Sequence, residues 1–237
     1  MAEKESIVFV VAHPDDVTYS AGGTAWLLHE KYDLHVLCAS KGERGYTQTE
    51  REKFEGTPPP SAELAAIREG EEKKACEILG ASLTFLGQID GEIHPDREVC
   101  DRVAGILADI RPKAVLTHGP LEKKDHSAVF SIAYQALHLA DVFWTTDLCM
   151  FHHDAGTYNT HAPCLYVNIS DVIEHKADLV RCHQTQFRHS LDSVLERNRI
   201  LGQMVYADYA EAFQTCFPPM GRRWDRDCEC GKFLLDL

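Results

Sequence analysis

The feature that most constrains the fold is an uninterrupted apolar and largely β-branched run, Ile7-Val-Phe-Val-Val-Ala12. A strand without polar alternation is typical of a parallel sheet that is buried on both faces. A polar turn, a helical segment from about Ala21 to Lys31 and a second apolar run, Leu34 to Ala39, follow it. This order predicts a βαβ unit.

The same alternation continues along the chain. Further strands are predicted at residues 83–86, 114–117, 148–151 and 165–169. Further helices are predicted at 61–79, 99–110, 125–139, 171–188 and 191–207, with a long loop at 40–60. The helix after Ser61 has an apolar stripe that we expect to face the core: Leu64, Ile67, Ala75, Ile78 and Leu79. We therefore expect residues 1–237 to form a single α/β domain, a Rossmann-like three-layer α/β/α fold with a mostly parallel sheet.

Charge and targeting signals narrow the class of function. The chain has 24 Lys and Arg against 37 Asp and Glu, a net charge of −13 that disfavours binding to phosphate backbones. We find no segment long enough to insert into a membrane and no export signal. We expect a cytoplasmic protein with reduced cysteines and no nucleic-acid partner.

Polar residues follow the predicted strands, where open α/β sheets bind their ligands. His13 and Asp16 flank a turn after the first strand, and His126 follows the fourth. Two histidines and one carboxylate form a known catalytic zinc set, and Asp15 is placed to accept a proton from the metal's water. The same residues are also common in turns and helix caps, so spacing alone leaves a structural role open.

A glycine pair early in the first helix also has two readings. Gly22-Gly23-Thr24 allows either close helix packing or phosphate binding. Because the chain lacks a G-x-G-x-x-G or P-loop run, a nucleotide-binding Rossmann enzyme has little support.

Several motifs together resemble those of a known family. The motifs are Ala12-His-Pro-Asp-Asp16, Gly22-Gly-Thr24, Lys41-Gly-Glu-Arg-Gly45, Arg68-x-x-Glu71, Leu86-Gly87 to Asp90-Gly91, Asp125-His126 and, late in the chain, Ile169-Ser-Asp171, Lys176, His183-Gln-Thr-Gln186 and Ala210-Glu-Ala-Phe213. They resemble the LmbE-like (PIG-L) zinc-dependent N-acetylglucosaminyl de-N-acetylases, and the later ones its bacillithiol-pathway branch. The resemblance runs from about residue 8 to 213, and the tail at 217–237 lies outside it.

This resemblance implies an activity and a set of roles. The reaction would be hydrolysis of an N-acetyl group from an N-acetylglucosamine-type sugar or conjugate, by a cytoplasmic enzyme that forms homo-oligomers. His13, Asp16 and His126 would bind Zn²⁺ or another divalent metal, with Asp15 as general base. Arg68 would approach the substrate together with Glu43. Relatives differ in the group attached to the sugar.

The chain departs from the family pattern at two positions. Val17 stands where the family usually has Glu, at a position that binds no metal. Lys123 stands where the family has a histidine that assists catalysis, and Asp125 would support that group. Lys123 could supply positive charge there, or His118, His152 or His153 could replace the histidine. This departure motivates an alternative, a metal-binding sugar or conjugate receptor with weak or lost catalysis.

Overall fold

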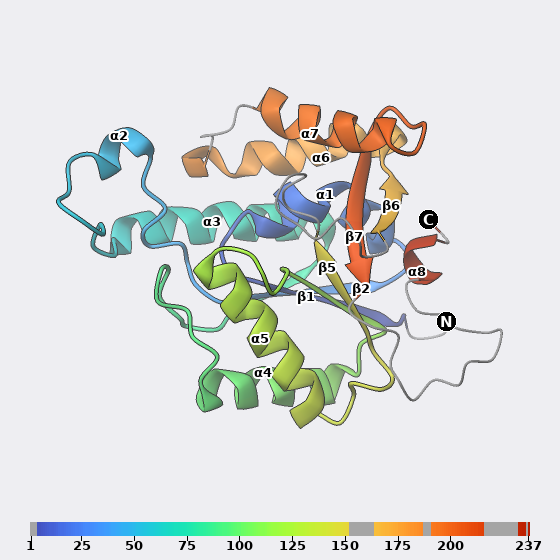
Figure 1. Ribbon diagram of the computed structural model, residues 1–237, viewed down its shortest axis with the longest axis horizontal. Coiled ribbons are helices and arrows are strands. Elements are labelled where there is room, and N and C mark those ends of the chain that lie inside the picture. Colours follow the sequence, from blue (N-terminus) through green and yellow to red (C-terminus); the bar gives the residue numbers. More distant parts are fainter. Residues whose placement is uncertain (1–3, 152–163, 187–190, 216–231, 236) are drawn as a thin grey trace.

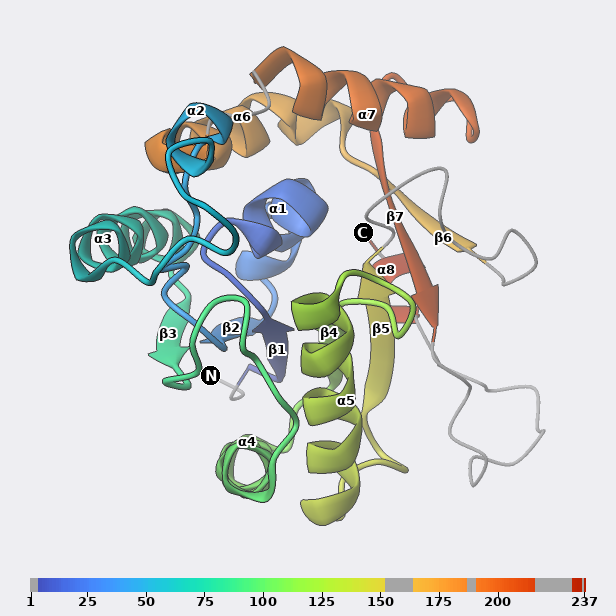
Figure 2. The same cartoon turned by 60° about the vertical axis from the view of Figure 1, so that its left-hand side comes forward.

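The computed structural model describes residues 4–151, 164–186, 191–215, 232–235 and 237. Seven strands form one sheet in the order β3-β2-β1-β4-β5-β7-β6. Their bounds are β1 Ser6–Val11, β2 Asp33–Cys38, β3 Ser82–Phe85, β4 Ala114–Thr117, β5 Asp147–Phe151, β6 Cys164–Asn168 and β7 Ala210–Thr215. The first five are mutually parallel, whereas β7 runs antiparallel to both of its neighbours, β5 and β6 (Figure 2). The mostly parallel sheet is thus confirmed.

Helices cover both faces of the sheet and complete the three predicted layers (Figure 1). One face carries α1 (Asp16–His29), α3 (Ala62–Leu79) and α6 (Ile173–Cys182), with α7 (Leu191–Gln203) beside α6. The other face carries α4 (Arg97–Ile110) and α5 (Lys124–Leu139). The short helices α2 (Gln48–Arg51) and α8 (Lys232–Leu235) lie outside these layers. No described helix has both the length and the apolar character needed to cross a bilayer.

The central strand β1 explains why the chain folds this way. Every residue from Ile7 to Ala12 is fully buried, as the continuous apolar run predicts. Ile7, Phe9 and Val11 join the core under α1 and α3, and the alternate residues join the core under α4 and α5. Because both faces of β1 are packed, the polar residues that follow it are held in a fixed position.

The predicted apolar stripe of α3 is partly wrong. The side chains of Ile67 and Ile78 are exposed, whereas the buried face includes Arg68, Glu71 and Glu72. This face turns toward the loops at the carboxyl ends of the strands, where polar groups find hydrogen-bond partners. The predicted ends of the helix are correct, because Ser61 accepts a hydrogen bond from the backbone of Leu64 and Gly80 adopts a left-handed conformation.

Other predicted boundaries shift. The first helix begins at Asp16 rather than near Ala21, where its backbone instead breaks from helical geometry. The helix predicted at 171–188 is shorter in the structure, because α6 starts at Ile173 and ends at Cys182. A 3₁₀ turn at Gln184–Gln186 follows, and residues 187–190 lie outside the described ranges. Strand β7 was not predicted, and α2 forms within the predicted loop.

Candidate metal centre

The three predicted ligands converge at the carboxyl ends of β1 and β4. His13 follows β1, Asp16 begins α1 and His126 lies in the first turn of α5. One carboxylate oxygen of Asp16 lies 3.6 Å from Nδ1 of His13, and the other lies 3.6 Å from Nε2 of His126. One ligand atom from each residue falls within 4.8 Å of the others.

These spacings fit a tetrahedral cation. Two ligands about 2.0–2.1 Å from a tetrahedral zinc ion are separated by roughly 3.3 Å, and the two distances from the Asp16 carboxylate to the histidine nitrogens are close to this value. The donors are two imidazoles and one carboxylate, a set that suits zinc and several other divalent metals. The three residues therefore fit a metal ion, which would bind between the exit of β1 and the start of α5.

Glu122, which is not among the predicted site residues, supports this set. Glu122 Oε2 lies 2.6 Å from Nδ1 of His126, which directs the Nε2 atom of His126 toward Asp16. The same oxygen lies 3.3 Å from Nδ1 of His118. Glu122 is four residues after His118 and four before His126, and this alternation of His and Glu leading into α5 is the signal that would have revealed it.

His118 contacts two of the candidate ligands, Asp16 and His126, from the buried interior of the protein. Its ring is fully buried, stacks on His126 with centroids 3.8 Å apart, and places Nε2 3.0 Å from Asp16 Oδ2. Asp16 also accepts hydrogen bonds from the backbone amides of Ala12 and His13. Burial alone would raise the pKa of Asp16, but His118 and His126 hold it well below its usual range. Asp16 is therefore an anion, as a metal ligand requires.

Asp15 has a strained backbone and a perturbed carboxyl group. Its φ of 100° is unusual for a residue with a side chain. Glu72 accepts a hydrogen bond from its backbone N–H at 2.9 Å, and Nη2 of Arg68 lies 3.4 Å from its carboxylate. Burial raises the pKa of Asp15 to about 7, although Arg68 opposes the rise. A carboxyl group with such a pKa suits proton transfer at neutral pH.

Arg68 reaches the site but is enclosed by backbone. Its guanidinium is 3% exposed and donates to the carbonyl oxygens of Pro14 at 2.7 Å and Gly42 at 3.1 Å. A Cβ atom at either Gly42 or Gly45 would overlap this guanidinium. The two glycines thus allow the loop after β2 to close around Arg68, which links it to the turn that carries Asp15.

The remaining predicted residues occupy the rim of the site. Glu43 accepts a hydrogen bond from the backbone N–H of Asp90, and Asp125 accepts one from Gly91. Asp125 also lies 3.3 Å from Nε2 of His13. Lys123 is the residue just before α5, and it is exposed to solvent. His152, His153 and the Cys228-x-Cys230 pair lie outside the described residues.

The glycine pair of α1 serves packing and a buried carboxylate. Glu211 of β7 accepts hydrogen bonds from the backbone amides of Gly23 and Thr24, just after the break at Ala21. Lys176 pairs with Glu211 at 2.5 Å, and both side chains are fully buried. A Cβ at Gly23 would lie 2.8 Å from Ile169. Of the two readings of this motif, the structure supports close packing.

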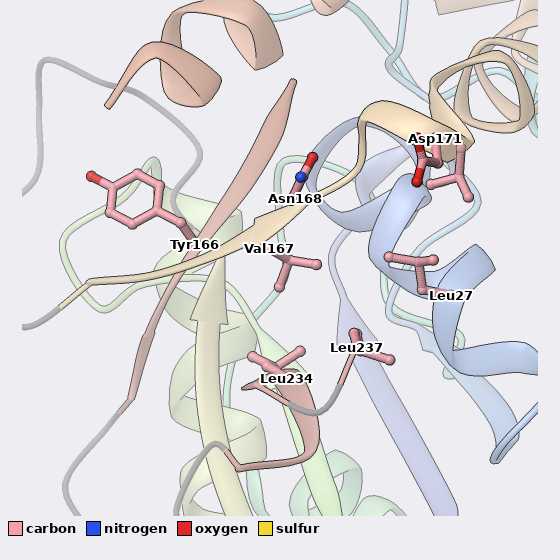
Figure 3. A pocket seen from close by; sticks show the side chains of 8 residues that line it. Leu27, Tyr166, Val167, Asn168, Asp171, Leu234 and Leu237 are labelled. Carbon is pink, nitrogen blue, oxygen red and sulfur yellow. The ribbon is translucent and has the colours of Figure 1, made fainter. Parts of the chain in front are cut away.

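A separate pocket of about 330 Å³ lies between the end of α1, β6 and α8 (Figure 3). Leu27, Leu234 and Leu237 form its apolar part, and Asn168 and Asp171 lie along its edge. It contains none of the candidate metal ligands, so it is distinct from the metal centre.

Comparison with known proteins places this chain in a family. Residues 8–137, more than half of the chain, match the family model PIG-L, described as GlcNAc-PI de-N-acetylase. The 4-oxalmesaconate hydratase of Pseudomonas putida is 27% identical over 91% of this chain and 90% of its own length. The diacetylchitobiose deacetylase of Thermococcus kodakarensis is 31% identical over 77% of this chain and 70% of its own length.

Solved structures show the same fold. The N,N'-diacetylchitobiose deacetylase of Pyrococcus horikoshii, solved with an inhibitor, superposes with a TM-score of 0.73 at 22% identity, covering 95% of this chain and 88% of that one. The sequence relatives include deacetylases and a hydratase, so they do not single out the bacillithiol-pathway branch. They do show that this chain belongs to the PIG-L family of enzymes.

Proposed function

We propose that the protein is a zinc-dependent hydrolase that removes the N-acetyl group from an N-acetylglucosamine-type sugar or conjugate. The observation that carries the proposal is the donor set of His13, Asp16 and His126, next to which the chain places Asp15, a carboxyl group with a pKa of about 7 that interacts electrostatically with Asp16 and His13. The likeness to diacetylchitobiose deacetylase supports the choice of an amide substrate.

A bound divalent cation would polarise the acetyl carbonyl, lower the pKa of a water molecule and stabilise negative charge on the carbonyl oxygen. Asp15 accepts the proton of the attacking water and then donates it to the nitrogen that leaves as an amine. One carboxyl group with a near-neutral pKa suffices for both steps. Arg68 and Glu72 hold Asp15 in the position that this transfer requires.

Substrate contacts form part of the same proposal. We assign the substrate-facing rim to the loops that carry Glu43 and Lys123, whereas Arg68 acts mainly by holding Asp15 and the loop after β2. Lys123 is exposed and cationic, so it suits an anionic group on the substrate better than it suits proton donation.

Hydration of a carbon–carbon double bond is a second candidate. The hydratase of Pseudomonas putida aligns with nine-tenths of this chain, and its name describes an oxo-carboxylate substrate. Both reactions require an activated water and a nearby acid–base group, so the metal centre alone fits either. In a hydratase, Lys123 would face a substrate carboxylate. A receptor that binds metal and sugar without turnover is the third candidate.

Parallel assays with zinc-loaded protein separate these candidates. We would measure acetate and free amine from N-acetylglucosamine, diacetylchitobiose and a malate conjugate, and loss of ultraviolet absorbance from 4-oxalmesaconate. We expect release of acetate that an Asp15→Asn variant reduces by about 10²–10⁴-fold while it still binds zinc. Acetate release that survives both chelation and Asp15→Asn would refute the proposal. Turnover of the oxo acid alone would establish the hydratase, and binding without turnover would establish the receptor.

A further inference from the structure

Two carboxylates, those of Asp90 and Asp125, face the ring nitrogen of His13 that points away from Asp16. Nε2 of His13 lies 3.2 Å from Asp90 Oδ1 and 3.3 Å from Asp125 Oδ2. The opposite ring nitrogen, Nδ1, faces Asp16. A carboxylate that accepts the Nε2 proton leaves the Nδ1 lone pair free for a metal, which fixes both the tautomer and the ring orientation.

Asp90 is held in this position from the neighbouring strand-end loop. Its Oδ2 atom accepts a hydrogen bond from the backbone N–H of Arg44 at 3.0 Å, and its carbonyl accepts one from Arg44 Nη1 at 2.6 Å. Its own N–H donates to Glu43 at 3.1 Å. Arg44 and Glu43 thus bind both sides of the Asp90 backbone and one oxygen of its carboxylate, and the other oxygen points at His13.

The opposite end of this short segment is held as well. The backbone N–H of Gly91 donates to Asp125, and its carbonyl accepts a hydrogen bond from Lys124 at 2.9 Å. The segment at 90–91 therefore bridges the loop after β2 and the start of α5, the two elements that flank His13. A bridge fixed at both ends can hold a histidine ring with little freedom to rotate.

We propose that Asp90, held by Arg44, is a positioning residue that orients His13 for the metal. This inference rests on the proposed metal centre but not on the identity of the reaction. It assigns Glu43 and Arg44 a role in supporting the site, because their groups bind the segment that carries Asp90. Asp90 and Asp125 both lie on the same ring nitrogen of His13, and this pair of carboxylates points to a demand on ring orientation.

The test compares the zinc affinity of purified full-length variants. Asp90→Asn keeps an oxygen for the Arg44 amide but presents an N–H group to His13, so it removes the acceptor and preserves the loop. We expect its Kd for zinc, measured by competition with a chromophoric chelator, to rise by about 10–100-fold. The melting temperature of the metal-free protein should not change. With cobalt as the probe, the visible spectrum should also change.

Glu92→Gln is the matched control. It removes the exposed partner of Arg44 at 2.5 Å and leaves every contact of Asp90 in place, so its zinc affinity should equal that of the wild type. If Asp90→Asn does not fold, Arg44→Lys provides a second variant, because it loses the contact with the Asp90 carbonyl and should weaken zinc binding by a smaller factor.

The outcomes separate this inference from the proposed function. Unchanged zinc affinity in Asp90→Asn would overturn the role of Asp90, even if the wild type releases acetate. Weaker binding in Asp90→Asn would support it, even if the wild type proves to be a hydratase. Binding of two zinc ions by the wild type, reduced to one by Asp90→Asn, would also overturn it, since Asp90 would then be a ligand.

Discussion

Replacement of Gly23 by alanine tests whether the glycine pair exists for close packing. A Cβ atom there would lie 2.8 Å from Cγ2, 2.9 Å from Cβ and 3.0 Å from Cδ1 of Ile169. The Cβ of Ile169 moves only with its backbone, so side-chain rotation cannot relieve the overlap. Ile169 is fully buried between β6 and α6, which leaves it little room to shift.

The expected magnitude follows from two opposing effects. Overpacking of a core costs about 1–3 kcal/mol, and this site falls near the upper end because three atoms are too close. The greater helix propensity of alanine returns about 0.5–1 kcal/mol. We therefore expect Gly23→Ala to lower the free energy of unfolding by about 2 kcal/mol. For a chain of this size, that change corresponds to roughly 4–8 °C in melting temperature.

The preceding glycine provides a matched control. A Cβ at Gly22 would lie 3.5 Å from Lys176 Cγ and 3.6 Å from Leu179 Cδ1, ordinary contact distances. Gly22→Ala should be neutral or stabilising by up to about 1 kcal/mol. Urea unfolding of both variants, followed by circular dichroism, measures the difference. Equal stability of the two variants would refute the packing argument.

Three further predictions concern the buried charges and the metal. Lys176→Met leaves Glu211 buried without its cation and should lower the free energy of unfolding by about 3–5 kcal/mol. Adding Glu211→Gln should restore part of this loss. A loss below about 1 kcal/mol in thermal unfolding would contradict the prediction. Burial lowers the pKa of His183 from 6.5 to about 3, with Arg68 adding to the effect. Because the unfolded chain protonates His183 below pH 6.5 and the folded protein does not, the free energy of unfolding falls by about 1.4 kcal/mol for each pH unit between 6.5 and about 3. We expect His183→Gln to reduce this loss of stability in acid, measured by urea unfolding between about pH 7.5 and 5. Removal of the metal by a chelator should lower the melting temperature of the zinc-loaded protein. Compared with protein in zinc at 100 times its Kd, the free energy of unfolding should fall by about 2.7 kcal/mol. Calorimetry that shows no change in melting temperature would contradict a bound metal.

The apolar pattern was sufficient to predict the parallel part of the sheet. Ile7 to Ala12 and Ala114 to Thr117 are continuous apolar or β-branched runs, and they form adjacent central strands. Strand β7 escaped prediction because its residues, Ala210 to Thr215, combine a buried Glu with small side chains and lack β-branched residues at its start. Glu211 is buried there only because the backbone of α1 and Lys176 satisfy it, a tertiary reason that local sequence does not display.

The same reasoning could predict the candidate ligands, because His13 and Asp16 directly follow a recognisable strand. Their assignment as zinc ligands stays a prediction, but the structure does bring them together with His126. The supporting residues were harder to foresee. Glu72 and Asp90 reach the site from a helix and a loop that are distant in sequence from His13 and His126.

The placement of β7 in the sheet has a consequence for biosynthesis. Glu211 lies nearly two hundred residues after the amides of Gly23 and Thr24 that it binds, and β7 separates β5 from β6. Amides at the break in α1 therefore stay without this partner until the ribosome has released the chain as far as Glu211. Contacts so remote in sequence form slowly, and nascent chains that wait for them expose apolar surface. A fragment limited to residues 8–137 would resemble such a stalled intermediate, prone to aggregation and dependent on chaperones, although it spans every candidate metal ligand.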